Sequence, residues 1–290
     1  MDKKLEKLKQ DYMNTPIPAE LDQIVRQSLQ PRRKPKRNAA WVAGIAAVAA
    51  VFVSSVNLSP AFAQALSEIP VVGGVVKLVT FVEYQVEDEK FHADIKVPAI
   101  ANLENKELES ALNAKYLEEN KKLYQEFMAE MEALKQQGGG HIGVDSGYEV
   151  VTDTERILSI QRYVVQTAAS GVETLQYDTI DKQEQVLITL PSLFRDDRYI
   201  SVISENIKEQ MRKQVKEEGK IYWVNGIDLD GPVDTFQSIS PTQDFYITKD
   251  GKLVISFDEY EVAPGYMGTV EFVIPTEAIA DLLVSDTYIK

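Results

Sequence analysis

One uncharged stretch constrains this chain more than any other feature, because no charged residue occurs between Arg37 and Glu68. Within it, residues 39–56 are almost wholly apolar, and seven of these 18 residues are alanine. At ~1.5 Å rise per residue such a helix reaches ~27 Å, close to the ~30 Å hydrocarbon core of a bilayer. The stretch predicts a single transmembrane helix over residues 39–58.

Small residues follow the apolar run at the spacing of a signal peptidase site. Ala61 pairs with Ala63, and Ala63 pairs with Ala65, in two overlapping small-x-small motifs. A cleaved secretory signal has a short basic head, whereas about thirty patterned residues precede the basic cluster here. A transmembrane helix that serves only as an uncleaved anchor needs no such motif. Two interpretations stay open, namely a span that is also cut after Ala63 or Ala65, and ordinary small residues at a helix end.

Charge differs sharply between the two sides of this stretch. Residues 1–37 carry a net charge of +5 and the whole chain carries −14, so the remainder carries −19. Cytoplasmic flanks favour Lys and Arg, so the basic cluster at residues 31–38 predicts a single-pass cell-membrane protein with a cytoplasmic N-terminus and an extracellular C-terminal domain. The acidic exterior disfavours nucleic acid and favours cationic ligands. The absence of cysteine excludes disulfides.

The cytoplasmic segment, residues 1–30, carries two short amphipathic patterns separated by a break at residues 14–18. Two such helices cannot bury their apolar faces against each other well enough to fold alone. We therefore expect the segment to fold onto a partner protein, although a solvated tail beside the membrane is the alternative. The apolar positions are Leu5, Leu8, Tyr12, Leu21, Ile24, Val25 and Leu29.

The exterior, residues 82–290, is predicted to be an α+β domain in which one long and one shorter helix pack on mostly antiparallel strands. The long helix is expected over residues 103–136, before three glycines, and the shorter one over 200–218, before Gly219. No strand-helix alternation of the doubly wound kind is predicted. Strands are expected at 82–100 around a charged turn, 147–154, 156–167, 174–179, 185–190, 221–224, 245–248, 253–258 and 269–274, and a short helix at 276–283.

The exterior shows no catalytic or metal-binding pattern, and we predict no enzyme activity and no cofactor. His92 and His141 are isolated and are interpreted as surface residues, since they have no zinc spacing or nucleophile partner. Residues 228–231 resemble the start of a calcium loop but lack the closing Glu, so a turn is expected. Residues 258–261, Asp-Glu-Tyr-Glu, are expected to form a solvated acidic strand face.

Residues 263–268 join two predicted strands through Pro264 and Gly265, yet place Tyr266 and Met267 at the tip. A turn that only connects two strands usually carries Asn or Asp at these positions. An exposed aromatic residue in a rigid turn is typical of an anchor for a protein or sugar partner. The alternative is that Tyr266 folds back onto the core.

Over its whole length the chain resembles the RsiV family of membrane-anchored anti-sigma factors, in the same order and without large insertions. The stretches that carry the likeness are residues 1–3, 16–22, 59–63, 102–108, 138–141, 189–194 and 257–264.

The resemblance implies partners on both sides of the membrane. The cytoplasmic residues would hold an extracytoplasmic-function sigma factor, and the exterior would bind C-type lysozyme. Signal peptidase would then cut outside the membrane and an intramembrane site-2 metalloprotease within it. For the lysozyme surface we expect the hairpin tips, Ser170 and Pro264-Gly265-Tyr266, since a convex tip can enter an enzyme's cleft. We also expect residues 59–81, which hold the cleavage site, to be shielded by their Leu66 to Phe81 part until ligand binds.

Two other functions stay open. One is an anchored enzyme acting on cell-wall glycan, against which stands the missing metal-ligand set. The other is a lysozyme inhibitor or wall-binding module without signalling, which would leave residues 1–30 without a sigma factor to bind.

Overall fold

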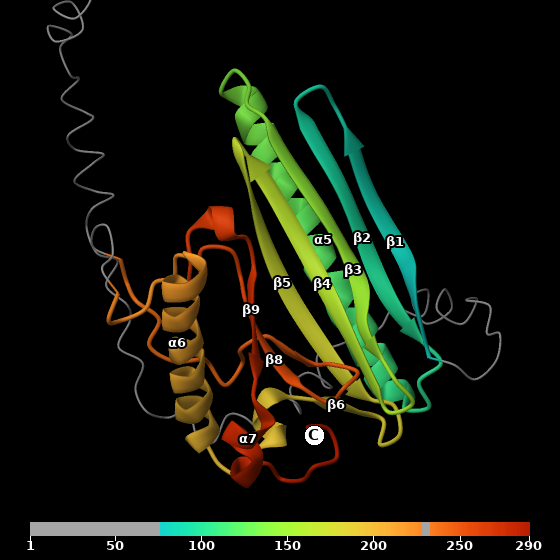
Figure 1. Cartoon of the computed structure of the whole chain (residues 1–290). Coiled ribbons are helices and arrows are strands. Elements are labelled where there is room, and N and C mark those ends of the chain that lie inside the picture. The colour runs from blue at the N-terminus through green and yellow to red at the C-terminus, as the bar shows by residue number, and fades with distance from the viewer. Residues whose placement is uncertain (1–75, 228–232) are drawn as a thin grey trace, which may run out of the picture. The chain divides into compact units, whose positions relative to one another are not determined.

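The computed structural model describes residues 76–227 and 233–290. All of these residues lie in one compact unit of the chain. The predicted α+β class is confirmed, with a six-stranded sheet in the order β1-β2-β3-β4-β5-β6 and a three-stranded sheet β7-β8-β9 (Figure 1). The strands of the large sheet are β1 (Lys77–Glu87), β2 (Phe91–Ala101), β3 (Ile142–Asp153), β4 (Ile157–Ala168), β5 (Ser170–Asp181) and β6 (Val186–Ile188).

The large sheet is antiparallel at every junction except one. Strands β2 and β3 pair in parallel, from Phe91 opposite Ile142 to Ile95 opposite Ser146. Helix α5 (Lys106–Gln136) makes the long connection that parallel neighbours require. The expectation of mostly antiparallel strands is therefore confirmed, but this one strand-helix-strand crossover was not predicted.

Helix α5 lies along one face of the large sheet (Figure 1). It begins at Asn105, whose side chain accepts hydrogen bonds from the backbone N–H groups of Glu107 and Leu108, as an N-cap does. It ends before Gly138 and Gly139, which both have positive φ. Its apolar face packs against β2, β3, β4 and β5; Leu112, Tyr116, Phe127 and Met131 are buried, and Leu108, Leu123 and Leu134 are partly buried.

A buried ion network joins α5 to the sheet. Arg162 of β4 is 7% exposed and donates to Glu119 of α5 at 2.7 Å and to Asp178 of β5 at 3.2 Å. Lys115 reaches the other oxygen of Asp178 at 3.0 Å. Burial raises the pKa of Asp178, but Lys115 and Arg162 outweigh it, so the net pKa is lowered. Two cations thus offset two carboxylates around the buried Arg162 and Asp178, while Lys115 and Glu119 remain partly exposed.

The second layer contains α6 (Arg198–Glu218) and the small sheet, β7 (Phe245–Ile247), β8 (Leu253–Phe257) and β9 (Val270–Ile274). Helix α6 packs against β9, and β7 lies beside β5, so the small sheet stands between α6 and the large sheet (Figure 1). The shorter predicted helix is confirmed as α6, in which Ile203, Ile207 and Met211 recur at four-residue spacing and are fully buried. Gly219 ends the helix with φ 69°, as expected.

The remaining elements are short, and several boundaries differ from prediction. They are η1 (Leu190–Leu193), η2 (Gly265–Met267), α7 (Thr276–Ile279) and η3 (Ala280–Leu282). Strand β1 begins at Lys77, five residues before the expected position 82, and β3 begins at Ile142 rather than 147. Residues 221–224 do not form the expected strand. Trp223 there donates its N–H to Val262 and accepts from Phe236, so its backbone links two separate segments instead of joining a ladder.

Candidate functional site

The first predicted contact tip, Ser170, lies where β4 turns into β5. The hairpin is tight, since Ala168 pairs with Ser170 and Ala169 between them takes φ 73°. Ser170 is exposed. The structure therefore places this residue at the end of two 12-residue strands, as the predicted hairpin loop requires.

The second tip, Pro264-Gly265-Tyr266, forms a single 3-10 turn that projects from a buried base. Val262 and Ala263 are 1% and 2% exposed, and Trp223 donates to the carbonyl of Val262 at 2.8 Å. The turn closes through Met267 N–H on the Pro264 carbonyl at 2.9 Å. The side chain of Tyr266 is 73% exposed, so it does not fold back onto the core.

Carboxylates of the small-sheet layer bind the outer edge of β5, along a contact that we call the seam. Asp258 accepts from Leu175 N–H at 2.7 Å, Glu259 accepts from Glu173 N–H at 2.9 Å, and Asp244 accepts from Tyr177 N–H at 2.9 Å. Strand β6 pairs only with residues 179–181 of this edge. Side-chain oxygens therefore take the place of a neighbouring strand.

This arrangement corrects the expectation of a solvated acidic strand face at residues 258–261. Strand β8 ends at Phe257, and these residues form a turn in which Glu261 N–H donates to the Asp258 carbonyl at 3.0 Å. Asp258 and Glu259 are half-buried hydrogen-bond acceptors. The sequence Asp-Glu-Tyr-Glu would look the same in a solvated strand face and in a turn that binds a strand edge. Only the position of β5 in the fold decides between these two structures.

Burial at the seam raises the pKa of three carboxyl groups, those of Asp244, Asp258 and Glu173. Burial raises the pKa of Asp244 to about 6, although the Tyr177 amide opposes the rise, and the charges of Asp258 and Asp178 add to it. Burial likewise raises the pKa of Asp258 and of Glu173, the latter with help from the charge of Glu259. The seam therefore carries negative charge at neutral pH that its surroundings do not fully stabilise.

Two tyrosines extend the seam toward β9. The rings of Tyr177 and Tyr246 stack with centroids 5.2 Å apart, and both hydroxyls donate to Glu271, at 2.8 Å and 3.1 Å. Burial, followed by the charge of Glu271, raises the pKa of Tyr246 to about 12. Both hydroxyls therefore stay protonated and act as donors at physiological pH.

The two histidines lie near the starts of the paired strands β2 and β3. His92 of β2 is partly exposed and contacts Glu87 at 3.0 Å and Asp145 at 3.1 Å. Burial opposes its charged form, but Asp145 and Glu87 outweigh that effect and raise its pKa. His141 is exposed. Within residues 76–227 and 233–290, no group of three or more His, Asp or Glu side chains is arranged to hold a metal ion.

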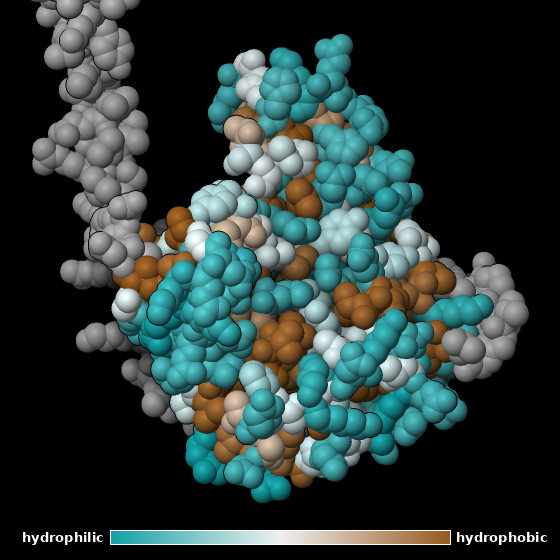
Figure 2. All heavy atoms as spheres, in the orientation of Figure 1, coloured by the Kyte–Doolittle hydropathy of each residue, from teal (hydrophilic) through white to brown (hydrophobic). Residues whose placement is uncertain are grey.

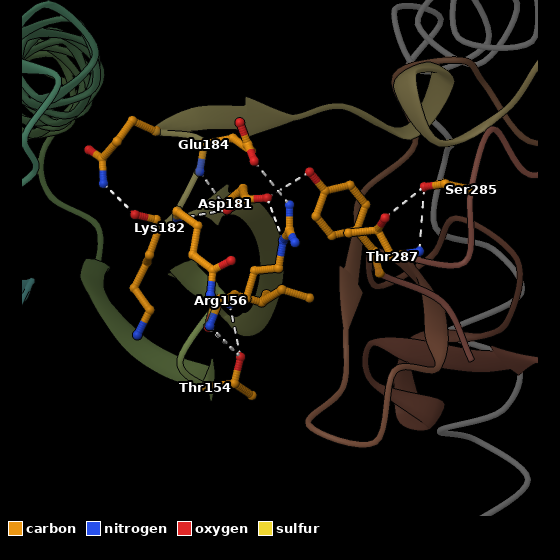
Figure 3. Close-up of polar contacts among 11 residues, drawn as sticks. Thr154, Arg156, Asp181, Lys182, Glu184, Ser285 and Thr287 are labelled. Atoms are coloured by element: carbon orange, nitrogen blue, oxygen red, sulfur yellow. Dashed lines mark hydrogen bonds and ion pairs between the residues drawn. The ribbon is translucent and has the colours of Figure 1, made fainter.

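The last residues of the chain bind the two sheets at the end of the domain opposite the hairpin tips. Asp181, fully buried, accepts from Arg156 at 2.8 Å and from the hydroxyl of Tyr288 at 2.7 Å (Figure 3). Lys252 donates to the carbonyl of Lys290 at 2.7 Å. A cavity of about 260 Å³ lies between Arg156 and the chain end. These contacts fasten the last residues to both sheets.

The surface around these features is mainly polar. In the view of Figure 2 hydrophilic side chains cover most of this face, with apolar patches between them. A second cavity of about 220 Å³, lined by Arg162, Lys122 and Glu126 among others, lies between α5 and the strands. Its charges largely cancel, so it shows no preference for an anion or a cation.

Several predicted sites lie outside the described residues. These are the transmembrane helix at 39–58, the calcium-like residues 228–231, the cleavage-site residues Ala61, Ala63 and Ala65, and the partner-binding residues Leu5, Leu8, Tyr12, Leu21, Ile24, Val25 and Leu29. Among helices of the described part, none is long and apolar enough to cross a membrane.

Sequence reasoning missed the seam and the Arg162 network. Both consist of charged residues on elements far apart in the chain, such as Glu173 with Glu259 and Arg162 with Glu119. An acidic residue directly after a buried strand end, as at Asp258, was the only local sign. The carboxylate of such a residue can accept a backbone N–H from the edge of a neighbouring strand as readily as it can bind water.

Comparison with known proteins gives one full-length relative. The chain is 50% identical over 292 aligned residues, covering 100% of both chains, to the anti-sigma-V factor RsiV of Bacillus subtilis strain 168. Residues 191–277 match a family described as "Protein of unknown function (DUF3298)".

Two solved structures share the fold at low sequence identity. A DUF3298 protein of Bacteroides fragilis has a TM-score of 0.50 and 16% identity, covering 73% of this chain and 95% of that one. A DUF3298 protein of Pseudomonas aeruginosa has a TM-score of 0.51 and 11% identity, covering 74% and 97%. The α+β layers described above are therefore an arrangement that recurs in other bacteria.

Proposed function

The chain belongs to the family of the anti-sigma-V factor RsiV, and from this we propose that it is a membrane-anchored anti-sigma factor that responds to lysozyme outside the cell. Family membership gives the anti-sigma role, and hence a sigma factor as partner. The observation that carries the proposal is the full length of the match, because it includes residues 1–75 as well as the exterior domain.

On the cytoplasmic side, residues 1–30 hold the extracytoplasmic-function sigma factor. Their apolar positions fill a groove on that protein, since two short amphipathic helices gain their stability from a partner. The contact residues are Leu5, Leu8, Tyr12, Leu21, Ile24, Val25 and Leu29.

The chain crosses the membrane once, through residues 39–58, with the basic cluster 31–38 on the cytoplasmic side. The apolar length and the charge difference support this topology. Residues 77–290, which include all the strands described above, then stand outside the cell.

The exterior domain binds a C-type lysozyme through its two tips, Ser170 and Pro264-Gly265-Tyr266. Support comes from their exposure and from the rigid base of the second tip. Lysozyme is a strongly basic enzyme, so the charge of −19 beyond residue 37 would steer it toward the domain and raise the association rate.

Ligand binding permits cleavage of the segment that joins domain and membrane. Signal peptidase cuts after Ala63 or Ala65, and a site-2 metalloprotease then cuts within the span and frees the sigma factor. Before binding, the Leu66 to Phe81 segment shields the site. Because β1 begins at Lys77, only eleven residues separate Ala65 from the sheet. Binding must favour the exposed state for this scheme to work.

The test is lysozyme-dependent cleavage in cells that express the full-length chain. Ala63→Trp removes a small residue from both possible sites and should leave the chain intact when lysozyme is added. Phe62→Trp changes only the position between the small residues and should be cut normally. Ala61→Trp blocks only a cut after Ala63, and Ala65→Trp only a cut after Ala65. Continued cleavage of Ala63→Trp at the same place would refute the site.

Binding is tested on each side separately. Residues 1–30 should capture a sigma factor from a cytoplasmic extract, and the full-length chain in detergent should bind purified lysozyme. A segment that captures no sigma factor would contradict the anti-sigma role. A chain that binds lysozyme but is never cut would leave a binding module without signalling.

A further inference from the structure

The turn at residues 258–261 contacts the second tip on one side and, on the other, the strand β5 that carries the first tip. On one side, the hydroxyl end of the Tyr260 ring lies against Gly265, so closely that a methyl group built on Gly265 would overlap ring carbons and the hydroxyl. Tyr260 itself is 50% exposed. The 3-10 turn that carries Tyr266 therefore rests on this ring.

On its other side the same turn is fastened to β5. Glu259 and Glu173 exchange two hydrogen bonds, from Glu173 N–H to the Glu259 carboxylate at 2.9 Å and from Glu259 N–H to the Glu173 carbonyl at 3.3 Å. Leu175 N–H donates to Asp258 at 2.7 Å. Glu173 lies three residues after Ser170, so these bonds fix the base of the Ser170 hairpin.

We propose that the 258–261 turn sets the separation of the two contact tips, with Tyr260 and Glu259 as its positioning residues. This inference rests on the proposed function, in which both tips contact one lysozyme molecule. A partner that binds two tips at once loses affinity when their separation varies, because binding must then freeze that motion. Tips that are held before binding avoid this loss.

The chain offers a direct measurement of tip separation, because it contains no cysteine. Ser170→Cys and Tyr266→Cys in the full-length chain accept two spin labels at defined positions. The labels should give a narrow distance distribution in the parent protein and with Tyr260→Phe, which keeps the ring. The distribution should broaden with Tyr260→Ala and with Glu259→Ala. An equally narrow distribution in both alanine variants would overturn the proposal.

Binding of a purified C-type lysozyme to the full-length chain gives the second readout. Tyr260→Ala should weaken binding about tenfold, chiefly through faster dissociation, whereas Tyr260→Phe should bind like the parent. Glu259→Gln keeps an acceptor for Glu173 N–H and removes only the charge, so it should slow association. Glu259→Ala should also speed dissociation. Equal effects of the Gln and Ala variants would show that charge, not position, matters.

A double-mutant cycle separates positioning from direct contact. Gly265→Ala alone should weaken binding about tenfold, because its methyl group displaces the Tyr260 ring. In the Tyr260→Ala background the same methyl group meets no ring, so Gly265→Ala should add almost nothing. Additive losses would refute the packing argument. Thermal unfolding of each variant checks that the fold is retained.

The outcomes distinguish this inference from the function on which it rests. Broadened tip distances in a chain that never binds lysozyme would support the positioning role and refute the lysozyme proposal. Normal lysozyme binding by both alanine variants would refute the positioning role and leave the lysozyme proposal standing.

Discussion

Asp244 offers a sharp test of how the two layers are joined. Its carboxylate accepts the Tyr177 N–H at 2.9 Å, yet burial raises its pKa from 3.8 to about 6. The folded protein therefore binds a proton more tightly than the unfolded chain does. Stability contributed by this group is complete below the unfolded pKa near 4 and is lost as pH rises toward 6.

The magnitude follows from the pKa difference. A rise of about two pH units corresponds to about 3 kcal/mol, which is the upper limit of what ionised Asp244 costs at pH 7. Asp244→Asn keeps an oxygen for Tyr177 N–H and removes the charge. Its new amide donor needs a partner, which costs part of the gain, so we expect the variant to be about 1 to 2 kcal/mol more stable at pH 7.

The assay is thermal unfolding of the full-length chain in detergent, followed by circular dichroism between pH 4 and pH 8. For a domain of this size the gain at pH 7 corresponds to a rise in Tm of about 2 to 8 °C. Near pH 4, where Asp244 is protonated, the gain should disappear, and the variant should be about 1 to 2 kcal/mol less stable than the parent because the cost of its amide donor remains. Asp250→Asn, at an exposed turn position, serves as the control and should not change Tm.

Two results would refute this reasoning. Unfolding curves of Asp244→Asn and the parent that shift together at every pH would mean that Asp244 is not buried against β5. A variant that is less stable at pH 7 would mean that the charged bond to Tyr177 N–H outweighs the cost of burial. Asp258 also has a raised pKa, so some pH dependence should persist in the variant.

Three further predictions concern separate parts of the molecule. Tyr266→Ala should weaken lysozyme binding about thirtyfold without changing Tm, as loss of an exposed aromatic anchor does, and unaltered affinity would remove this turn from the interface. Association with lysozyme should slow as salt rises from about 50 to about 500 mM, because the steering field is screened; a constant rate would refute steering. Arg162→Met should destabilise the chain by about 3 to 5 kcal/mol in chemical unfolding, since Asp178 is left buried with one partner fewer, whereas Arg162→Met with Asp178→Leu should recover part of the loss.

The sequence predicted what local periodicity determines. The stripe from Leu112 to Met131 and the spacing of Ile203, Ile207 and Met211 define helix faces within one element, so α5 and α6 were placed correctly. Exposed Tyr266 in its turn was also predicted. Strand partners are not a local property, and the parallel pairing of β2 with β3 has the same apolar pattern as an antiparallel pairing would have.

The missed features share a physical cause. Glu259 and Asp258 have the sequence context of solvated acids, and whether they bind water or a strand edge depends on where β5 lies. Trp223 has strand-like neighbours, but its backbone bonds go to Val262 and Phe236 on different segments. In both cases the deciding partner is distant in sequence, so composition and spacing carry no information about it.

The seam also joins the two tips that we propose as the lysozyme-binding surface. Ser170 belongs to the large sheet and Tyr266 to the small-sheet layer, and their layers meet through charged side chains rather than a continuous sheet. Such a junction is weaker at neutral pH than paired strands, because its carboxylates are poorly stabilised. A cationic partner bound across both tips would lessen that cost and so stabilise the junction in the arrangement that it already has. Backbone pairing extended from β6 along all of β5 would join the layers without this dependence on charge.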